Sequence, residues 1–180
     1  MEEILLIGGG GHCKSVIDVI EQENRYKIAG IIDKKELIGQ YVLGYKIIAC
    51  DDDLDQLFKS YKNAIVTVGQ IESPKLRVKL FTKLKTIGYN TPTIISPLAY
   101  VSKHATISEG TIIMHQVLVN ASVNIGKNCI INTKALIEHD TKIEDNCHIS
   151  TASVINGGVT VKDGTFFGSN ATSKEYIQID

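Results

Sequence analysis

Large aliphatic residues recur at every sixth position over the second half of the chain. Only one member of the series, Ser173, is polar. An α-helix cannot keep this period on one face, because it turns every 3.6 residues or so, and a single amphipathic strand alternates every two. A repeat of six residues is typical of a solenoid of short strands, the parallel β-helix. The series is Ile95, Val101, Ile107, Ile113, Val119, Ile125, Ile131, Ile137, Ile143, Ile149, Ile155, Val161, Phe167, Ser173 and Ile179.

A second set of mostly small residues lies four positions after these, from Ala99 and Ala105 to Thr165 and Ala171. We expect a three-sided prism with one hexapeptide per face, in which the large residue points inward and the small one fills the corner. Three hexapeptides make a coil of 18 residues, so residue i lies below residue i+18 at a strand spacing of about 4.8 Å. The pattern therefore predicts interior columns, one of which is Ile107, Ile125, Ile143 and Val161.

The first half of the chain has a different pattern, with short apolar runs between helical segments. Ile4–Ile7 predicts a buried strand that ends at four glycines, and a helix is expected from His12 to about Glu23. A second strand over Ile28–Ile32 ends at Asp33. This is a βαβ unit whose glycine-rich turn faces a helix N-terminus, which is a site suited to an anion or a nucleotide.

Three further elements complete this region. Leu54–Tyr61 predicts a short helix after three aspartates, and Ala64–Val68 predicts a strand that ends at Gly69. A helix is expected from the Ser73-Pro74 pair to Ile87. We expect a small parallel sheet with flanking helices over residues 1–92, followed by the repeats over residues 93–180.

The glycine-rich turn matches the dinucleotide fingerprint only in part. Gly8 and Gly10 supply its first two glycines, but Cys13 occupies the third position. Asp33 lies near the spacing of the acidic residue that binds a ribose hydroxyl, yet too few residues remain for a second half of an NAD-binding fold. A nucleotide or sugar site is therefore preferred to an NAD site. The alternative is that the glycines only permit tight packing of strand on helix.

Composition and charge exclude several functions. A hydrophobic content of 43% with 22% charged residues is ordinary for a globular protein, and the net charge of −1 gives no footprint for nucleic acid or membrane. No apolar run approaches the roughly 18 residues of a membrane span. We expect a cytoplasmic protein. The four cysteines lack C-x-x-C spacing, which argues against zinc, and Cys129 and Cys147 are expected to stack as a reduced pair.

The candidate chemistry of the repeats is a histidine beside a carboxylate. His139 and Asp140 fall near a corner of the prism, where adjacent side chains need not face opposite ways. Asp140 can then fix the tautomer of His139 as a general base; the alternative is a solvated turn with no chemical role. His148 lies half a coil further on and is expected on a different face. That separation argues against a metal site within one chain and suits a cleft between subunits.

The repeats resemble the left-handed β-helix acyltransferases. Within that superfamily, I-G-G-G-G-H-C-K, I-I-D, V-G-Q, and I-N-T-K-A-L-I-E-H-D followed by C-H-I-S resemble the bacterial sugar acetyltransferases. These comprise the sialic acid O-acetyltransferases and the N-acetyltransferases of nucleotide-linked 4-amino sugars. The resemblance covers nearly the whole chain. It implies an α/β Rossmann-like domain followed by an all-β left-handed parallel β-helix.

The resemblance also implies a homotrimer that binds acetyl-CoA between neighbouring subunits and needs no metal. His139 is implied as the base with Asp140 as its partner, and Asn132, His148 and Gly157 are implied at the acetyl-CoA site. The small N-terminal domain is implied to bind the nucleotide of the acceptor. The residues that match the family at this second site are Gly8, Gly9, Gly10, Gly11, His12, Asp33 and Gly69.

The expected reaction is N-acetylation of a nucleotide-linked 4-amino sugar for a bacterial surface glycan. O-acetylation of a sialic acid is the alternative reaction. A trimeric scaffold that binds a sugar nucleotide without catalysis is an alternative from another functional class. A β-helix metalloenzyme of the carbonic anhydrase kind would need three convergent histidines, and the histidine spacings of this sequence argue against it. Relatives usually continue for one or two more coils, so we expect a C-terminally truncated β-helix domain.

Overall fold

The computed structural model describes all 180 residues, which form two compact units. The first unit comprises residues 1–69 and 75–92, and the second comprises residues 70–74 and 93–180. The fold is the one predicted, an α/β unit of Rossmann type and a left-handed parallel β-helix. None of the helices is long and apolar enough to cross a membrane.

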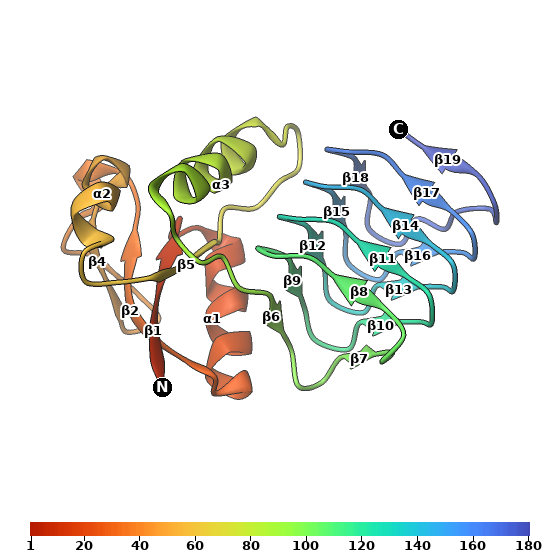
Figure 1. The fold of residues 1–180 in the computed structure, drawn as a ribbon, viewed down its shortest axis with the longest axis horizontal. Helices are drawn as coiled ribbons and strands as arrows, with labels where there is room; N and C mark the ends of the chain where they lie inside the picture. Colours follow the sequence, from red (N-terminus) through yellow and green to blue (C-terminus); the bar gives the residue numbers. More distant parts are fainter. The chain divides into compact units, whose positions relative to one another are not determined.

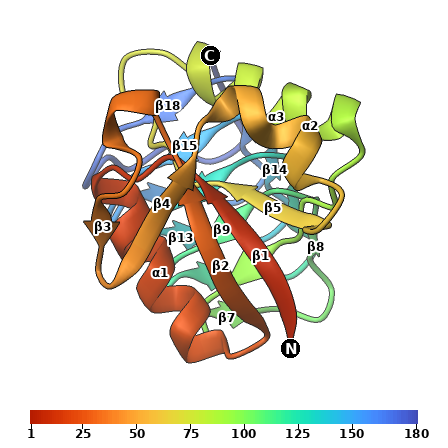
Figure 2. The same ribbon diagram turned by 90° about the vertical axis from the view of Figure 1, so that its left-hand side faces the viewer.

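The first unit contains a five-stranded sheet in the order β3-β4-β2-β1-β5 (Figures 1 and 2). Strands β4, β2, β1 and β5 are parallel to one another, and only the edge strand β3 is antiparallel. The bounds are Glu2–Ile7 for β1, Tyr26–Ile32 for β2, Tyr41–Val42 for β3, Tyr45–Ala49 for β4 and Asn63–Val66 for β5.

The β3-β4 hairpin was not predicted. Its two-residue turn is Leu43-Gly44, and both residues have positive φ, at 47° and 86°. Such turns match the twist of the flanking strands, but they usually carry Asn or Asp where this chain has leucine. The sequence signal for this hairpin was therefore weak.

The helices of this unit are α1 (Gly11–Glu23), α2 (Leu54–Leu57) and α3 (Lys75–Ile87), with 3₁₀ turns at Lys35–Leu37 and Asp51–Asp53. Helix α1 buries Cys13, Val16, Ile17 and Ile20 along one face, as an amphipathic helix should. Helix α2 is shorter than predicted. The N–H of Lys59 already bonds three residues back to Gln56, so the chain tightens into a turn before Tyr61.

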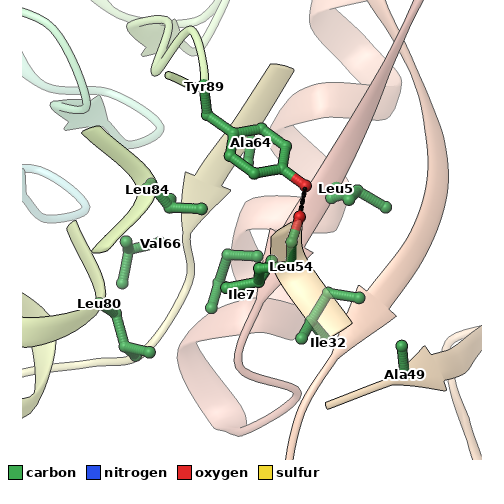
Figure 3. Packing of buried hydrophobic residues seen from close by; sticks show 10 residues of the cluster. All are labelled: Leu5, Ile7, Ile32, Ala49, Leu54, Ala64, Val66, Leu80, Leu84 and Tyr89. Carbon is green, nitrogen blue, oxygen red and sulfur yellow. Dashed lines mark hydrogen bonds between the residues drawn. The ribbon is translucent and has the colours of Figure 1, made fainter. Parts of the chain in front are cut away.

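One face of the sheet packs against α2 and α3. The hydroxyl of Tyr89 lies within this core and donates a 2.8 Å hydrogen bond to the carbonyl oxygen of Leu54, so its polar atom is satisfied (Figure 3). Burial of each large side chain contributes about 1.5–3 kcal/mol to folding. The cluster consists of Leu5, Ile7, Ile32, Ala49, Leu54, Ala64, Val66, Leu80, Leu84 and Tyr89.

The second unit is a stack of coils with three parallel sheets (Figure 1). We name each face after one outward residue. The Leu136 face has β7 (Tyr100–Val101), β10 (Leu118–Val119), β13 (Leu136–Ile137) and β16 (Val154–Ile155). The Lys142 face has β8 (Thr106–Ile107), β11 (Asn124–Ile125), β14 (Lys142–Ile143), β17 (Thr160–Val161) and β19 (Gln178–Ile179). The His148 face has β6 (Ile94–Ile95), β9 (Ile112–Ile113), β12 (Ile130–Ile131), β15 (His148–Ile149) and β18 (Phe166–Phe167).

Residues 18 apart pair directly, which confirms the predicted register. Ile125 pairs with Ile107 on one side and with Ile143 on the other, and Ile143 pairs with Val161. Three of these four residues are at most 2% exposed. The period of six therefore predicted the strand register as well as the fold class.

The corners repeat as strictly as the strands. From Gly110 onward every sixth residue has positive φ, including Asp140 at 61° and Ala152 at 55°. The left-handed conformation costs most L-residues about 1–2 kcal/mol, and Gly, Asn and Asp adopt it most readily. The complete series is Gly110, Gln116, Ser122, Asn128, Lys134, Asp140, Asn146, Ala152, Gly158, Gly164, Asn170 and Tyr176.

The polar residue of the inward series is accommodated by hydrogen bonds. Ser173 is 7% exposed, and its Oγ accepts a 2.8 Å bond from the backbone N–H of Asn156. The side-chain amide of Asn156 donates in turn to the carbonyl oxygen of Ser173. The stack then resumes with β19, which pairs with β17 on the Lys142 face.

Candidate active site

His139 and Asp140 form a hydrogen-bonded pair at the corner between the Leu136 and Lys142 faces. Nδ1 of His139 lies 2.8 Å from Oδ2 of Asp140, and both side chains are more than half exposed. Neighbouring residues face the same way here because Asp140 has the left-handed conformation of the corner. A carboxylate accepts hydrogen bonds, so Nδ1 carries the proton and Nε2 carries the lone pair. The pair has the geometry of an oriented general base.

Gly157 lies against the ring of His139, one coil further along the stack. A Cβ at residue 157 would lie 2.9 Å from Cε1 of His139, closer than real Cβ contacts allow, and 3.0 Å from its Nε2. The next residue, Gly158, donates its backbone N–H to the carbonyl oxygen of His139 at 3.0 Å. The absence of a side chain at Gly157 is therefore what lets the imidazole occupy its position.

Two further polar residues support the loop that carries His139. Oε2 of Glu138 accepts a 2.8 Å hydrogen bond from the side-chain amide of Asn120 and a 3.3 Å bond from the backbone N–H of His139. Asn120 is fixed by the bond from the N–H of Ala121 to its Oδ1. These bonds tie the corner at His139 to the coil before it.

Asn132 and His148 form a second group. Nδ2 of Asn132 lies 3.2 Å from Nε2 of His148, and Nδ1 of His148 bonds to the backbone carbonyl oxygen of Gln70. His148 is only 6% exposed, and the ring of Phe166 packs edge-on against it at 5.1 Å between centroids. Both ring nitrogens of His148 are thus engaged by the protein itself, and the polar side chain of this group with remaining donor capacity is Asn132.

The two groups lie at different corners of one prism. His139 follows β13 on the Leu136 face, whereas Asn132 follows β12 on the His148 face and His148 lies on β15 of that face. His139 and His148 are therefore on different faces, as their spacing predicted. The structure brings His139, Asp140 and Gly157 together, and it does not bring Asn132 or His148 to them within one chain.

The glycine-rich loop of the first unit lies where β1 meets the N-terminus of α1. Gly8 has φ of 104°, and a side chain there would collide with Val68. Gly10 and Gly11 face open space, with no atom near a Cβ built on them. No side chain caps α1, and its first turn has no acidic residue. The N–H groups of this turn are available to an anion.

Asp33, His12 and Gly69 lie beside this loop. Oδ2 of Asp33 accepts a 2.5 Å hydrogen bond from the N–H of Gly9, and its Oδ1 accepts one from the N–H of Lys34. His12 approaches Gly69, whose built Cβ would lie 3.5 Å from the Cβ of His12. All seven residues predicted for the nucleotide site thus gather at the carboxyl end of the sheet. Asp33 also holds the glycine loop, a role that sequence reasoning did not assign to it.

A pocket of about 280 Å³ adjoins Asp33. Lys34 and Lys35 line it from the end of β2, and Cys50 and the following aspartates line it from the end of β4. Burial raises the pKa of Asp51, an effect that the nearby Lys83 partly offsets. A larger groove, of about 510 Å³, runs along the Lys142 face and is lined by polar residues such as Asn124 and Lys142, but it contains none of the predicted site residues.

Gln70 is the site residue that sequence reasoning missed. Gly69 was assigned from the V-G-Q motif, but the next residue belongs to the second unit and bonds to His148. The sequence signal for Gln70 was its place in the V-G-Q motif, directly after the end of a predicted strand. The structure contains no group of three or more His, Cys, Asp or Glu side chains that could hold a metal ion.

Residues 3–84 match the PglD N-terminal domain family, and no curated protein matches the chain. A mutant of GDP-perosamine N-acetyltransferase from Caulobacter crescentus, in complex with CoA and GDP-perosamine, is 25% identical with a TM-score of 0.84, over 99% of this chain and 91% of that chain. The acetyltransferase domain of PglB from Neisseria gonorrhoeae, in complex with acetyl coenzyme A, is 25% identical with a TM-score of 0.89, over 98% and 84%. WeeI from Acinetobacter baumannii is 20% identical with a TM-score of 0.72, over 99% and 94%, and shows the fold alone.

Proposed function

We propose that the chain is a hexapeptide-repeat sugar acetyltransferase with a PglD-type N-terminal domain, and that it acetylates the amino group of a nucleotide-linked sugar with acetyl-CoA. The observation that carries the proposal is the His139-Asp140 pair lying against Gly157. A base with one nitrogen fixed and the other exposed is what removal of a proton from an attacking amine requires.

The reaction forms a nitrogen–carbon bond and breaks the carbon–sulfur bond of the thioester. Nε2 of His139 removes a proton from the amine as it attacks the carbonyl carbon, and the same proton then passes to the departing CoA thiolate. Asp140 stabilises the imidazolium that exists between these steps. A positioned base of this kind contributes about 10²–10⁴-fold to the rate.

The oxyanion needs a donor near the thioester carbonyl. The N–H of Gly158 is already bonded to the carbonyl oxygen of His139, and so we assign the oxyanion contact to the N–H of Gly157. Removal of one such donor typically costs an enzyme about 10²–10³-fold in kcat. This role adds to the contact of Gly157 with the ring of His139.

We assign the nucleotide of the acceptor to the glycine loop of the first unit. Its diphosphate is expected on the free N–H groups at the start of α1, and its ribose or base is expected near Asp33. This assignment rests on the open space beside Gly10 and Gly11 and on the short hydrogen bond from the N–H of Gly9 to Asp33. Activated sugars and acetyl-CoA are cytoplasmic metabolites, so we place the reaction in the cytoplasm, as a step in surface glycan synthesis.

We further propose that the active site is completed between copies of the chain in a homotrimer. Asn132 and His148 lie on a different corner and face from His139, so one chain alone cannot place both groups on the same thioester. A neighbouring prism can supply Asn132 where this chain supplies His139. Sedimentation should give a trimer, and mixing the impaired variants His139→Ala and Asn132→Ala should raise the activity through hybrid sites. Failure of exchanged mixtures to recover would contradict a shared site.

The function is tested by a thiol-release screen. The full chain is incubated with acetyl-CoA and with UDP-, GDP-, dTDP- or CMP-linked sugars, each with and without a free amine. We expect CoA release only with an amine-bearing sugar and one preferred nucleotide, with a mass gain of one acetyl group on the sugar. Acetylation confined to hydroxyl-bearing sialic acids would identify an O-acetyltransferase, and sugar binding without CoA release would indicate a scaffold.

A further inference from the structure

Residues 70–74 form a short strap that belongs to the β-helix unit. Gln70 is 2% exposed, and its Nε2 donates to the carbonyl oxygen of Asn146 at 2.9 Å and to that of Gly164 at 3.2 Å. These two acceptors lie one coil apart in the same column of left-handed corners. Pro74 closes the other end of the strap, because a Cβ at Gly164 would lie 3.3 Å from its ring. Gln70 therefore anchors the strap to two successive coils.

The backbone of the same residue determines the proton position on His148. Nδ1 of His148 bonds to the carbonyl oxygen of Gln70, which can only accept, so Nδ1 must carry a hydrogen. Nε2 of His148 lies 3.2 Å from Nδ2 of Asn132, which can only donate, so Nε2 must carry a lone pair. If both ring nitrogens of His148 carried a hydrogen, its Nε2–H would face the Nδ2 group of Asn132, and two donors would oppose each other. The contacts on both sides thus select one neutral tautomer.

Asn132 is oriented by this tautomer. Its Oδ1 accepts a 2.8 Å bond from the N–H of Thr133, and its Nδ2 is directed to His148. An Nδ2 group has two hydrogens, so one remains for a ligand acceptor such as a carbonyl oxygen. If His148 changed tautomer, its Nε2–H would oppose that amide, and Asn132 would have to rotate or move.

We propose that Gln70 is a positioning residue for acetyl transfer: the strap holds the Gln70 carbonyl on Nδ1 of His148, and the resulting tautomer aims the side-chain amide of Asn132. Gln70 acts through His148 and does not touch a substrate. Its effect on the rate rests on the proposed function, whereas its effect on the tautomer does not.

The decisive variant is Gln70→Met, which keeps the side-chain length and removes the donors to Asn146 and Gly164. Ring ¹⁵N chemical shifts of His148, assigned by comparison with His148→Asn, should show a single Nδ1–H tautomer in the wild type and a mixture in Gln70→Met. Gln178→Met, on the exposed β19 strand, is the matched control and should leave the shifts unchanged. An Nε2–H tautomer or an imidazolium in the wild type at neutral pH would overturn the proposal, even if Gln70→Met did not fold.

The kinetic consequence is a fall in kcat of about 10-fold in folded Gln70→Met, since a misplacement of about 1 Å can cost up to 10²-fold. The double variant with Asn132→Ala should be no slower than Asn132→Ala alone, because both changes act on the same amide. Full additivity, or an unchanged tautomer in folded Gln70→Met, would contradict the coupling. A wild type that releases no CoA with any sugar nucleotide would refute the function and leave the tautomer result standing.

Discussion

The imidazole of His139 rests on the backbone of Gly157, with Cε1 only 2.9 Å from where a Cβ of residue 157 would be. The two residues are one coil apart, and the register of the β-helix brings them together. The contact explains why a residue without a side chain is needed one coil beyond the histidine. It also makes the position of the base sensitive to the smallest substitution.

Gly157→Ala should therefore impair catalysis by displacing the ring of His139. We expect kcat to fall by about 10²-fold, as for a displacement of about 1 Å of a catalytic group. Gly168→Ala is the control, because a Cβ at residue 168 meets no atom within 4 Å. Both variants should be assayed by thiol release and by thermal unfolding. Equal activity of the two folded variants would show that His139 does not depend on this contact.

Asp140→Asn isolates the charge of the carboxylate. Asparagine adopts the left-handed conformation of this corner as readily as aspartate and can still accept from Nδ1 through its amide oxygen, so the fold should be unchanged. The imidazolium loses its counter-charge, and kcat should fall by about 10²-fold with little change in the KM for acetyl-CoA. If the variant were as active as the wild type, the role of Asp140 would be only to form the left-handed corner.

Ala152→Gly should stabilise the protein. Alanine at φ of 55° is strained by about 1–2 kcal/mol, and glycine is not, although glycine adds about 0.5–1 kcal/mol of backbone entropy to the unfolded chain. The net gain is expected at about 0.5 kcal/mol in urea unfolding. Ala171→Gly, at a position without positive φ, should instead destabilise. The opposite order of the two variants would contradict the account of the corners.

The buried cysteines should be inert and Cys50 reactive. Burial raises the pKa of the Cys13 thiol to about 11, with an opposing hydrogen bond from Thr67, and of the four cysteines only Cys50 is not buried. Iodoacetamide at pH 8 should therefore label Cys50 first in the native protein, as mass spectrometry would show. Labelling of Cys13 at the rate of Cys50 would contradict this burial.

The same thiol makes stability depend on alkaline pH. Because the folded-state pKa of Cys13 is raised, its contribution to stability is complete below the unfolded pKa of about 9 and is lost as the pH rises toward 11. The free energy of unfolding should fall over this window. In Cys13→Ala the fall should be smaller, and an identical slope in both proteins would contradict the assignment.

The fold was predictable because its signal is a repeat. Each inward residue, from Ile107 to Val161, specifies its neighbours 18 positions away, so the period determined the register. The His139-Asp140 pair was also predictable, because corner geometry lets adjacent residues face the same way. The corner conformation recurs every six residues, and asparagine, which adopts it readily, occupies three of these positions, Asn128, Asn146 and Asn170.

The surroundings of the second group, Asn132 and His148, could not be predicted in the same way. His148 lies on a different face from His139, as predicted, but its burial was not predicted, because the strap from Gln70 bonds to it across 78 positions of sequence. No local period predicts such a contact. The role of Asp33 in holding Gly9 was hidden for the same reason, since the two lie 24 positions apart on neighbouring strands.

The central claim is that His139 is the general base of an acetyl transfer. The most direct measurement is kcat for CoA release by His139→Ala, with acetyl-CoA and the preferred amine-bearing sugar nucleotide at saturation. The account predicts a loss of at least about 10²-fold with the fold and the oligomeric state unchanged. A kcat equal to that of the wild type would contradict it.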